Sequence, residues 1–302
     1  SLAQLIVDSS EISHNQSLLG EGAGINCSAD AYDSAFAKVM VTNSVIRNNK
    51  SSNNSKGGGI KCFSNTTFPP ATSNVIVENS TFENNQATNG AAINCESTNR
   101  TSVDIINSSF NNNKATGNGS AILSYGFNNN SSFMENSSIL TISGSTISNN
   151  ESGANGAIYS RGRNYSELNF NTSTLTGNKS SGSSGIISLS NDTSKINIKN
   201  ATIYNNTGGA AVAYNRYDSK HILTTEGSII AGNKPLNISP YISTPIISRG
   251  HNIFTEIFVA GSVASDLKGF DSVALNLDTL NFNGGNTKTL LPLYPSVALN
   301  QG

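Results

Sequence analysis

The chain has little charge. Only 12% of its 302 residues are Asp, Glu, Lys or Arg, and the formal net charge is −1. Nucleic acids and anionic membranes are bound through basic patches, so this composition argues against both as partners. The chain also lacks an apolar run long enough to span a bilayer. It begins at Ser1 with neither a start methionine nor a signal peptide, and we interpret it as a processed or excised piece of a longer protein.

Residues that build catalytic and metal sites are scarce and scattered. His14, His221 and His251 lie far apart, and the nine Asp and ten Glu residues occur mostly singly. Enzymes that cleave glycosidic bonds need paired carboxylates, and no such pairing recurs in the sequence. We therefore predict no catalytic residues, no metal site, no cofactor and no enzymatic activity.

Two segments with arginine and tyrosine are candidates for contact with a sugar ring, since both side chains stack on flat surfaces. They are Arg161-Gly162-Arg163 with Tyr165, and Tyr214-Asn215-Arg216-Tyr217-Asp218. Such loops are more often ordinary solvated surface, which is the favoured interpretation. Arg249-Gly250-His251 weakly resembles a galacturonase-type sequence, but the chain lacks the paired Asp motifs of those enzymes.

What the chain does have is a repeat. Its anchor is a serine, replaced once by alanine, with an apolar residue two positions later and an asparagine five positions later. The anchors are Ser10, Ser44, Ser80, Ser108, Ser145, Ser173, Ala201 and Ser228, spaced by 34, 36, 28, 37, 28, 28 and 27 residues. The asparagines are Asn15, Asn49, Asn85, Asn113, Asn150, Asn178, Asn206 and Asn233. Repeats of this period are typical of solenoids, whose length is not limited by the size of one core.

Each copy contains three candidate strands. Before the anchor stands a pair of apolar residues two apart, such as Val75 and Val77, which predicts a short strand with one face inward. Asn or Gly precedes most anchors and tolerates the left-handed backbone of a corner. The apolar residue after the anchor, Phe82 in the same copy, predicts a second strand.

The repeated asparagine predicts the second corner, where stacked amides can hydrogen-bond to one another and to the backbone. The third candidate strand completes the coil and begins with small residues. Its members are Gly24-Ile25, Gly59-Ile60, Ala92-Ile93, Ala121-Ile122, Ala157-Ile158, Gly185-Ile186 and Ala211-Val212. We thus predict an all-β, single-stranded parallel β-helix with three short strands per coil. About eight regular coils occupy residues 1–233, and irregular terminal coils with a C-terminal cap occupy residues 234–302.

Extra residues concentrate between the third strand and the next anchor, in residues 28–38, 63–74 and 125–139. Insertions on one face of a solenoid often form a binding face. Unconstrained variation in loop length explains the pattern equally well.

The three cysteines, Cys27, Cys62 and Cys95, each follow a closing isoleucine by two residues. We expect them to stack as an inward ladder, continued by the serines Ser124, Ser160 and Ser188. A buried thiol ladder is the main interpretation, and one disulfide between neighbouring rungs is the second. A metal site is disfavoured, because thiols in a line do not surround a tetrahedral centre.

Asn-x-Ser/Thr triplets occur at 20 positions. They arise by chance in a chain this rich in Asn, Ser and Thr, but become surface glycan sites if the source glycosylates asparagine. The candidates for N-glycosylation are Asn65, Asn79, Asn99, Asn107, Asn118, Asn130, Asn164, Asn191 and Asn200.

Paired signals of the form G-[GA]-[GA]-I and [FI]-x-x-N, as in Gly57-Gly58-Gly59-Ile60 and Phe82-Glu83-Asn84-Asn85, resemble the repeats of chlamydial polymorphic outer-membrane proteins and bacterial β-helix surface proteins. The ending is similar to the NGGxTxT…LLPxSPAI ending of large secreted β-helix proteins. It reads Asn283-Gly284-Gly285-Asn286-Thr287-Lys288-Thr289, then Leu290-Leu291-Pro292, then Pro295 to Gly302, with Val297 departing from the usual pattern. The resemblance implies a right-handed helix and a role in surface display, adhesion or assembly.

These observations predict a non-enzymatic extracellular or cell-surface protein, either an adhesin-like rod or a self-assembling fibre subunit. The expected partners are other copies stacked end to end, or surface glycans and proteins of a host or neighbour. The alternative is a carbohydrate-binding or polysaccharide-cleaving β-helix protein.

Overall fold

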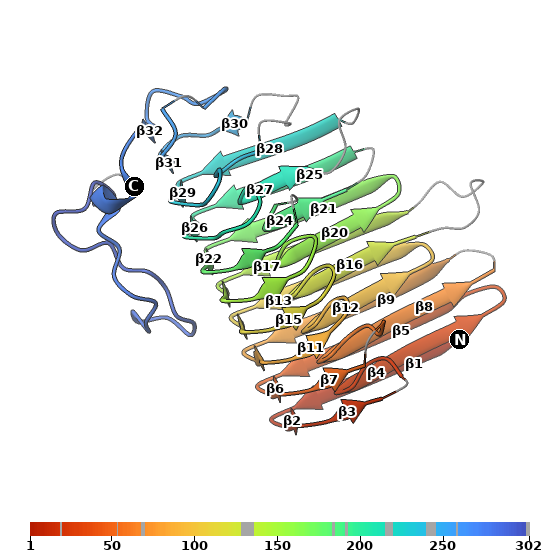
Figure 1. The fold of residues 1–302 in the computed structure, drawn as a ribbon. Helices are drawn as coiled ribbons and strands as arrows, with labels where there is room; N and C mark the ends of the chain where they lie inside the picture. The colour runs from red at the N-terminus through yellow and green to blue at the C-terminus, as the bar shows by residue number, and fades with distance from the viewer. Residues whose placement is uncertain are drawn as a thin grey trace.

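Short strands repeat along the chain and stack on their counterparts in the next repeat (Figure 1). The computed structural model describes residues 1–18, 20–52, 54–67, 70–127, 136–182, 185–190, 193–214, 220–239, 246–257 and 259–299. All strand pairs within the four sheets are parallel, and each strand pairs with the equivalent strand of the neighbouring coil. The protein is an all-β parallel solenoid.

We name the four sheets A to D in the order in which a coil visits them. Sheet A contains β1 (Leu2–Asp8), β5 (Ala35–Thr42), β9 (Ala71–Glu78), β13 (Arg100–Ile106), β17 (Ser137–Ser143), β21 (Tyr165–Asn171), β25 (Thr193–Lys199), β28 (Lys220–Glu226) and β30 (Ile247–Ser248). Sheet B contains β2 (Glu11–Ser13), β6 (Val45–Arg47), β10 (Thr81–Glu83), β14 (Ser109–Asn111), β18 (Thr146–Ser148), β22 (Thr174–Thr176), β26 (Thr202–Tyr204), β29 (Ile229–Ala231), β31 (Ile253–Phe254) and β32 (Leu267–Lys268).

The other two sheets complete the coil. Sheet C contains β3 (Gln16–Ser17), β7 (Lys50–Ser51), β11 (Gln86–Ala87), β15 (Lys114–Ala115), β19 (Glu151–Ser152) and β23 (Lys179–Ser180). Sheet D contains β4 (Ile25–Ala31), β8 (Ile60–Thr66), β12 (Ile93–Ser97), β16 (Ile122–Gly126), β20 (Ile158–Gly162), β24 (Ile187–Leu189) and β27 (Val212–Tyr214). A short 3-10 helix, η1 (Ser272–Leu275), follows the last strand.

Each of the first six coils therefore has four strands, where the repeat predicts three. The additional strand is the two-residue segment of sheet C, which begins directly after the ladder asparagine, as β11 does after Asn85. Two residues are too few to show a period in sequence. Beyond β29 the strands of sheets A and B shorten to two residues.

Two details of the predicted coil differ in the structure. Ile158 pairs with Ile187 rather than with Ile186, so the third predicted strand of the sixth coil begins one residue later than the repeat suggests. The extra residues of the first two coils lengthen strands instead of forming loops only, since β4 and β8 have seven residues and β5 and β9 have eight. Residues 68, 69 and 128–135 of the predicted insertions lie outside the described residues.

The core is a set of columns in which equivalent side chains lie over one another. In sheet B, from β6 to β29, the central residue of each strand points inward and is buried, and Phe82 and Phe110 stack with ring centroids 4.8 Å apart. Burying each such side chain contributes roughly 1.5–3 kcal/mol. The flanking residues, such as Thr81 and Glu83, point outward, so sheet B presents a polar outer wall in these coils.

Two columns of left-handed residues form the corners on either side of sheet B. The first precedes the anchors, as predicted, and contains Ser9, Asn43, Asn79, Asn107, Gly144, Thr172, Asn200 and Gly227. The second precedes the ladder asparagines and contains His14, Asn48, Asn84, Asn112, Asn149, Gly177, Asn205 and Gly232. Thr172 is the one β-branched residue in these columns, and a β-branched residue at φ 44° is strained.

The repeated asparagines form a continuous hydrogen-bonded ladder. The backbone N–H and the side-chain amide of each donate to Oδ1 of the next, from Asn15 to Asn233. The second amide hydrogen reaches a carbonyl of the preceding coil, as from Asn85 to Ile46. From Asn49 onward these side chains are buried, so the ladder satisfies polar groups that would otherwise be costly to bury.

The anchor serines form a second ladder that the repeat does not reveal by itself. Each hydroxyl donates to the carbonyl two residues earlier, and from Ser44 onward each also accepts the backbone N–H of the preceding anchor, as Ser80 Oγ does with Glu78 and Ser44. Ala201 occupies the next anchor position after Ser173 and has no hydroxyl. Within the described residues, the backbone N–H of Ser173 therefore lacks the serine acceptor that the anchors before it have at this position.

Both ladders end on carboxylates at the C-terminal end of the rod. Asn233 donates to Asn237, whose backbone N–H and side-chain amide donate to Glu256. Ser228 donates to Asn252, which in turn donates twice to Asp266. A carboxylate accepts without donating, so it terminates a chain of donors without requiring another coil.

Candidate functional site

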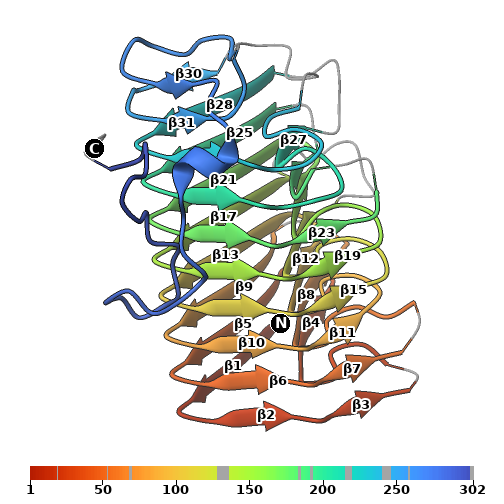
Figure 2. The ribbon, with the colours of Figure 1, turned by 60° about the vertical axis from the view of Figure 1, so that its left-hand side comes forward.

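The C-terminal segment lies along the outer face of sheet B (Figure 2). In the last coils the outward positions of this sheet change from polar to apolar, at Tyr204, Ile229 and Ala231. Leu275 of η1 is fully buried against this patch, beside the buried Ile253, and the partly buried Val297 and Ala298 pack against the same cluster. This change of outward residue type is the sequence signal that identifies the docking surface.

From this patch a hairpin extends over earlier coils. Its arms pair antiparallel through Leu277 with Pro292 and Asn281 with Thr289. Gly284, with φ 96°, lies at the turn, and Asn283 Nδ2 donates to the carbonyl and hydroxyl oxygens of Thr289 at 3.0 and 3.1 Å. The Asn283–Thr289 motif is therefore a hairpin tip.

Two hydrogen bonds attach the hairpin to the solenoid. Thr287 Oγ1 donates to the carbonyl of Gly144 at 2.8 Å, and Thr146 Oγ1 donates to the carbonyl of Lys288. Thr146 and Ser148 are consequently buried although they point outward from sheet B.

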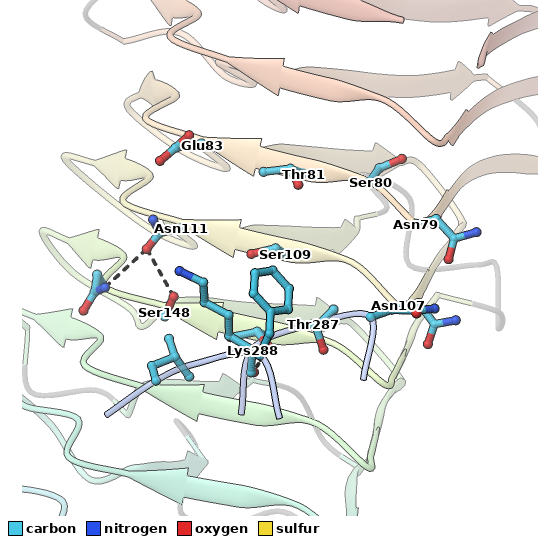
Figure 3. A pocket seen from close by; sticks show the side chains of 15 residues that line it. Asn79, Ser80, Thr81, Glu83, Asn107, Ser109, Asn111, Ser148, Thr287 and Lys288 are labelled. Atoms are coloured by element: carbon cyan, nitrogen blue, oxygen red, sulfur yellow. Dashed lines mark hydrogen bonds between the residues drawn. The ribbon is translucent and has the colours of Figure 1, made fainter. Parts of the chain in front are cut away.

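A groove of about 760 Å³ lies between the hairpin and sheet B. Its floor contains the outward residues of β10, β14 and β18, and its other wall contains Leu280, Phe282, Asn286, Thr287 and Lys288. Figure 3 shows Thr81 and Glu83 on one strand, Ser109 and Asn111 on the next and Ser148 on the third, with Lys288 near them. Asn79 and Asn107 lie at one end of the groove.

Most groups in the groove are neutral hydrogen-bonding groups. Asn111 Oδ1 accepts from Ser148 Oγ at 3.1 Å and from Asn149 Nδ2 at 3.3 Å, which orients its amide. The lining contains one carboxylate, Glu83, and one ammonium, Lys288, whose Nζ lies 5.6 Å from the centroid of the Phe282 ring. Phe282 is 62% exposed. The groove can therefore offer an aromatic face together with hydroxyl, amide and charged groups.

The structure brings the three cysteines together in sheet D, where Cys62 pairs with both Cys27 and Cys95. All three are free and buried. Cys62 Sγ donates to the carbonyl of Ala37 at 3.5 Å. Hydrogen bonding to Cys62 and burial raise the pKa of Cys27, while for Cys62 the effects of Cys95 and burial outweigh the lowering effect of Cys27, so its pKa is also raised.

Beyond Cys95 the column continues through Ser124 and Ser160 and then reaches Leu189, not Ser188. The one-residue shift at Ile187 moves Ser188 opposite Tyr159 instead. Ser124 and Ser160 both hydrogen-bond to Ser138, within a buried hydroxyl network.

The candidate glycosylation sites differ in exposure. Asn65, Asn79, Asn164 and Asn200 are exposed, and Asn107 is half-buried at the groove. Asn118 is half-buried, and its Oδ1 accepts two hydrogen bonds from Asn155. Asn99 is only 7% exposed, which leaves no room for a glycan on the folded coil. Asn130 and Asn191 lie outside the described residues.

The described residues of the segments considered for sugar contact do not line the groove. Arg161 lies over the ring of Tyr125 at 5.3 Å, and Tyr165 donates to Glu167 at 2.6 Å. Burial, with that carboxylate, raises the pKa of Tyr165 to about 12. Tyr214 is buried and stacks on His221 at 4.2 Å, whereas residues 215–219 lie outside the described part of the chain.

Arg249 and Gly250 belong to the turn between β30 and β31, where Gly250 and His251 have positive φ. Among the described residues, His, Cys, Asp and Glu side chains form no group of three able to hold a metal ion. The same part of the chain contains no helix with the length and hydropathy of a membrane span.

No protein-family model, curated protein or solved structure matches this chain.

Proposed function

We propose that this chain is a non-enzymatic, right-handed β-helix rod displayed outside the cell, where it acts as an adhesin-like surface protein. The observation that carries the proposal is the asparagine ladder, which runs from Asn15 to Asn233 without a missing rung. A ladder of this length joins every regular coil to its neighbours through buried hydrogen bonds. It gives the rigidity that a stalk requires.

The resemblance of the repeats and of the C-terminal motif to β-helix surface proteins supports the same proposal. The outer walls support it further, because sheet B presents Thr, Ser, Asn and Glu residues in coils three to five rather than a large apolar surface. Such a wall remains soluble along the length of an extended rod.

A fibre built by end-to-end stacking is a second candidate. The first coil exposes Leu2, Ile6 and Leu18, and the outer edge of β1 is unpaired in the described chain. Apolar side chains beside an open strand edge favour association. The other end offers less to a stacking copy, because Glu256 and Asp266 already terminate its ladders.

Two measurements test the proposal. Antibodies against the folded protein should label intact source cells, and the label should disappear when the cells are treated with an external protease. Electron microscopy of the purified protein should show separate rods. Label only after permeabilisation would contradict surface display, and long filaments with a regular axial repeat would favour the fibre.

A further inference from the structure

The floor of the groove repeats the same chemistry in three successive coils. Each of β10, β14 and β18 turns its first and third residues outward, and all six carry a hydroxyl, amide or carboxylate. Thr146 and Ser148 of β18 are buried and donate to Lys288 and Asn111, so β10 and β14 form the open part of the floor. Strands of adjacent coils are about 4.8 Å apart. Polar groups therefore recur along the rod at nearly the length of one sugar ring in an extended polysaccharide.

The hairpin supplies what the floor lacks. Phe282 is an aromatic side chain that remains 62% exposed beside a polar groove. Sugar rings have C–H faces that pack on aromatic rings and hydroxyl edges that hydrogen-bond to amides and carboxylates. Phe282 opposite Asn111 and Glu83 matches both features.

The charges of the groove favour a neutral ligand. Glu83 and Lys288 are its two charged residues and have opposite signs. A polyanionic glycan would meet one ammonium and one carboxylate, so it gains little net attraction. A neutral glycan can use Glu83 as an acceptor and Lys288 as a donor for hydroxyl groups.

An extended peptide fits this site poorly. Peptides that bind to sheets usually add a strand to an open edge. Here β10 pairs with β6 and β14, β14 with β10 and β18, and β18 with β14 and β22, so the groove offers no free strand edge.

We propose that the groove between β10, β14, β18 and the C-terminal hairpin binds a linear neutral oligosaccharide, with its chain along the rod axis and about one sugar per coil. Phe282 stacks on a sugar ring, and Glu83, Asn111 and Lys288 hydrogen-bond to hydroxyl groups. The inference rests on the proposed adhesin role, for which it names the ligand class and the site.

Binding is tested on purified, unglycosylated protein, so that no glycan on Asn79 or Asn107 occupies the groove. The probes are an array of linear neutral glycans, followed by calorimetric titration with the best tri- or tetrasaccharide. Phe282→Ala and Asn111→Ala are the test variants. Tyr32→Ala removes an equally exposed aromatic ring from the first coil and is the matched control.

We expect Phe282→Ala to raise Kd by about tenfold or more and Asn111→Ala to raise it severalfold. Tyr32→Ala should bind as the wild type does, and both Tyr32→Ala and Phe282→Ala should keep the wild-type thermal unfolding midpoint. Asn111→Ala removes the acceptor of the buried Ser148 hydroxyl, so it should lower the midpoint, and its binding is measured well below that temperature. The inference is overturned if no neutral glycan on the array binds, or if Phe282→Ala binds as tightly as the wild type. Surface labelling of cells does not depend on this result, so the two proposals fail separately.

Discussion

Asn113 donates both its backbone N–H and its side-chain amide to the same oxygen, Asn150 Oδ1, at 2.9 Å each. The amide also reaches the carbonyl of Phe82 in the preceding coil, so one side chain connects three coils. Asparagine combines the donor and acceptor capacity that this arrangement uses, whereas aspartate lacks the donors and serine lacks the reach.

Replacing a central asparagine of the ladder should strongly destabilise the protein. In Asn113→Ala the N–H and amide of Asn85 lose their acceptor in a buried environment, and we expect the free energy of unfolding to fall by about 2–5 kcal/mol. Urea unfolding followed by circular dichroism measures the loss. Asn65→Ala, at an exposed asparagine of β8, is the control and should change stability by less than about 0.5 kcal/mol. Equal effects of the two variants would contradict a structural role for the ladder.

The missing hydroxyl in the serine ladder predicts a stabilising substitution. Ala201 is buried above Ser173 in the serine column, so Ala201→Ser supplies an acceptor for the Ser173 N–H and a donor for the carbonyl of Lys199. We expect a gain of about 0.5–1.5 kcal/mol in the free energy of unfolding.

The reverse change, Ser145→Ala, removes the acceptor of the Ser108 N–H and should destabilise the protein by about 1–3 kcal/mol. If Ala201→Ser lowers the urea midpoint, the column at that coil is too tight for a hydroxyl.

The sequence predicts the ladders' positions better than it predicts the site. Period, inward columns and corners follow from residues that recur at fixed offsets, because each coil repeats the same local contacts. The groove arises from a contact between Thr287 and Gly144, which are 143 residues apart, and no repeat encodes such a pairing. The apolar outward residues Tyr204 and Ile229 are the local sign that something covers sheet B, but they do not identify the hairpin that continues beyond the cover.

The strained corner at Thr172 predicts another stabilising change. Its equivalents are mostly Asn or Gly, which accept the left-handed backbone at low cost, whereas a β-branched side chain does not. Thr172→Asn should raise the free energy of unfolding by about 1 kcal/mol. The reciprocal variant Asn107→Thr places a β-branched residue at the same corner two coils earlier and should lose a similar amount. Urea unfolding of both variants checks the pair, and a loss in Thr172→Asn would show that its hydrogen bond from Gly144 outweighs the strain.

The cysteine ladder should be chemically inert in the folded protein. The thiols are buried, and the raised pKa values of Cys27 and Cys62 leave almost no thiolate at neutral or mildly alkaline pH. Mass spectrometry after iodoacetamide treatment should show no modification in the native state and three alkylated thiols after denaturation. Ser28→Cys, at an exposed position beside Cys27, should react quickly under native conditions. An intact protein mass lower by two hydrogen atoms, together with a single alkylated thiol after denaturation, would instead indicate a disulfide between two neighbouring cysteines of the ladder.

Acid should open the rod first at its C-terminal end. Burial raises the pKa of Asp266, but hydrogen bonds from Ser248, Val263 and Asn252 outweigh it and hold the pKa below its ordinary value of 3.8. A carboxylate with a lowered pKa in the folded state stabilises that state above the ordinary pKa, and this contribution disappears as the pH falls through the folded value.

We therefore expect stability to fall as the pH drops below 3.8, with the coil that contains Asn252 affected before the central coils. Limited pepsin digestion, with fragments identified by mass, locates the first opening. In Asp266→Asn the side chain no longer titrates and cannot act as a carboxylate acceptor, so the free energy of unfolding at neutral pH should be lower by about 1–3 kcal/mol. The same variant should lose less of its remaining stability than the wild type when the pH is lowered. First cleavage in a central coil, or the same acid sensitivity in Asp266→Asn, would show that the carboxylate does not terminate the ladder in the manner described.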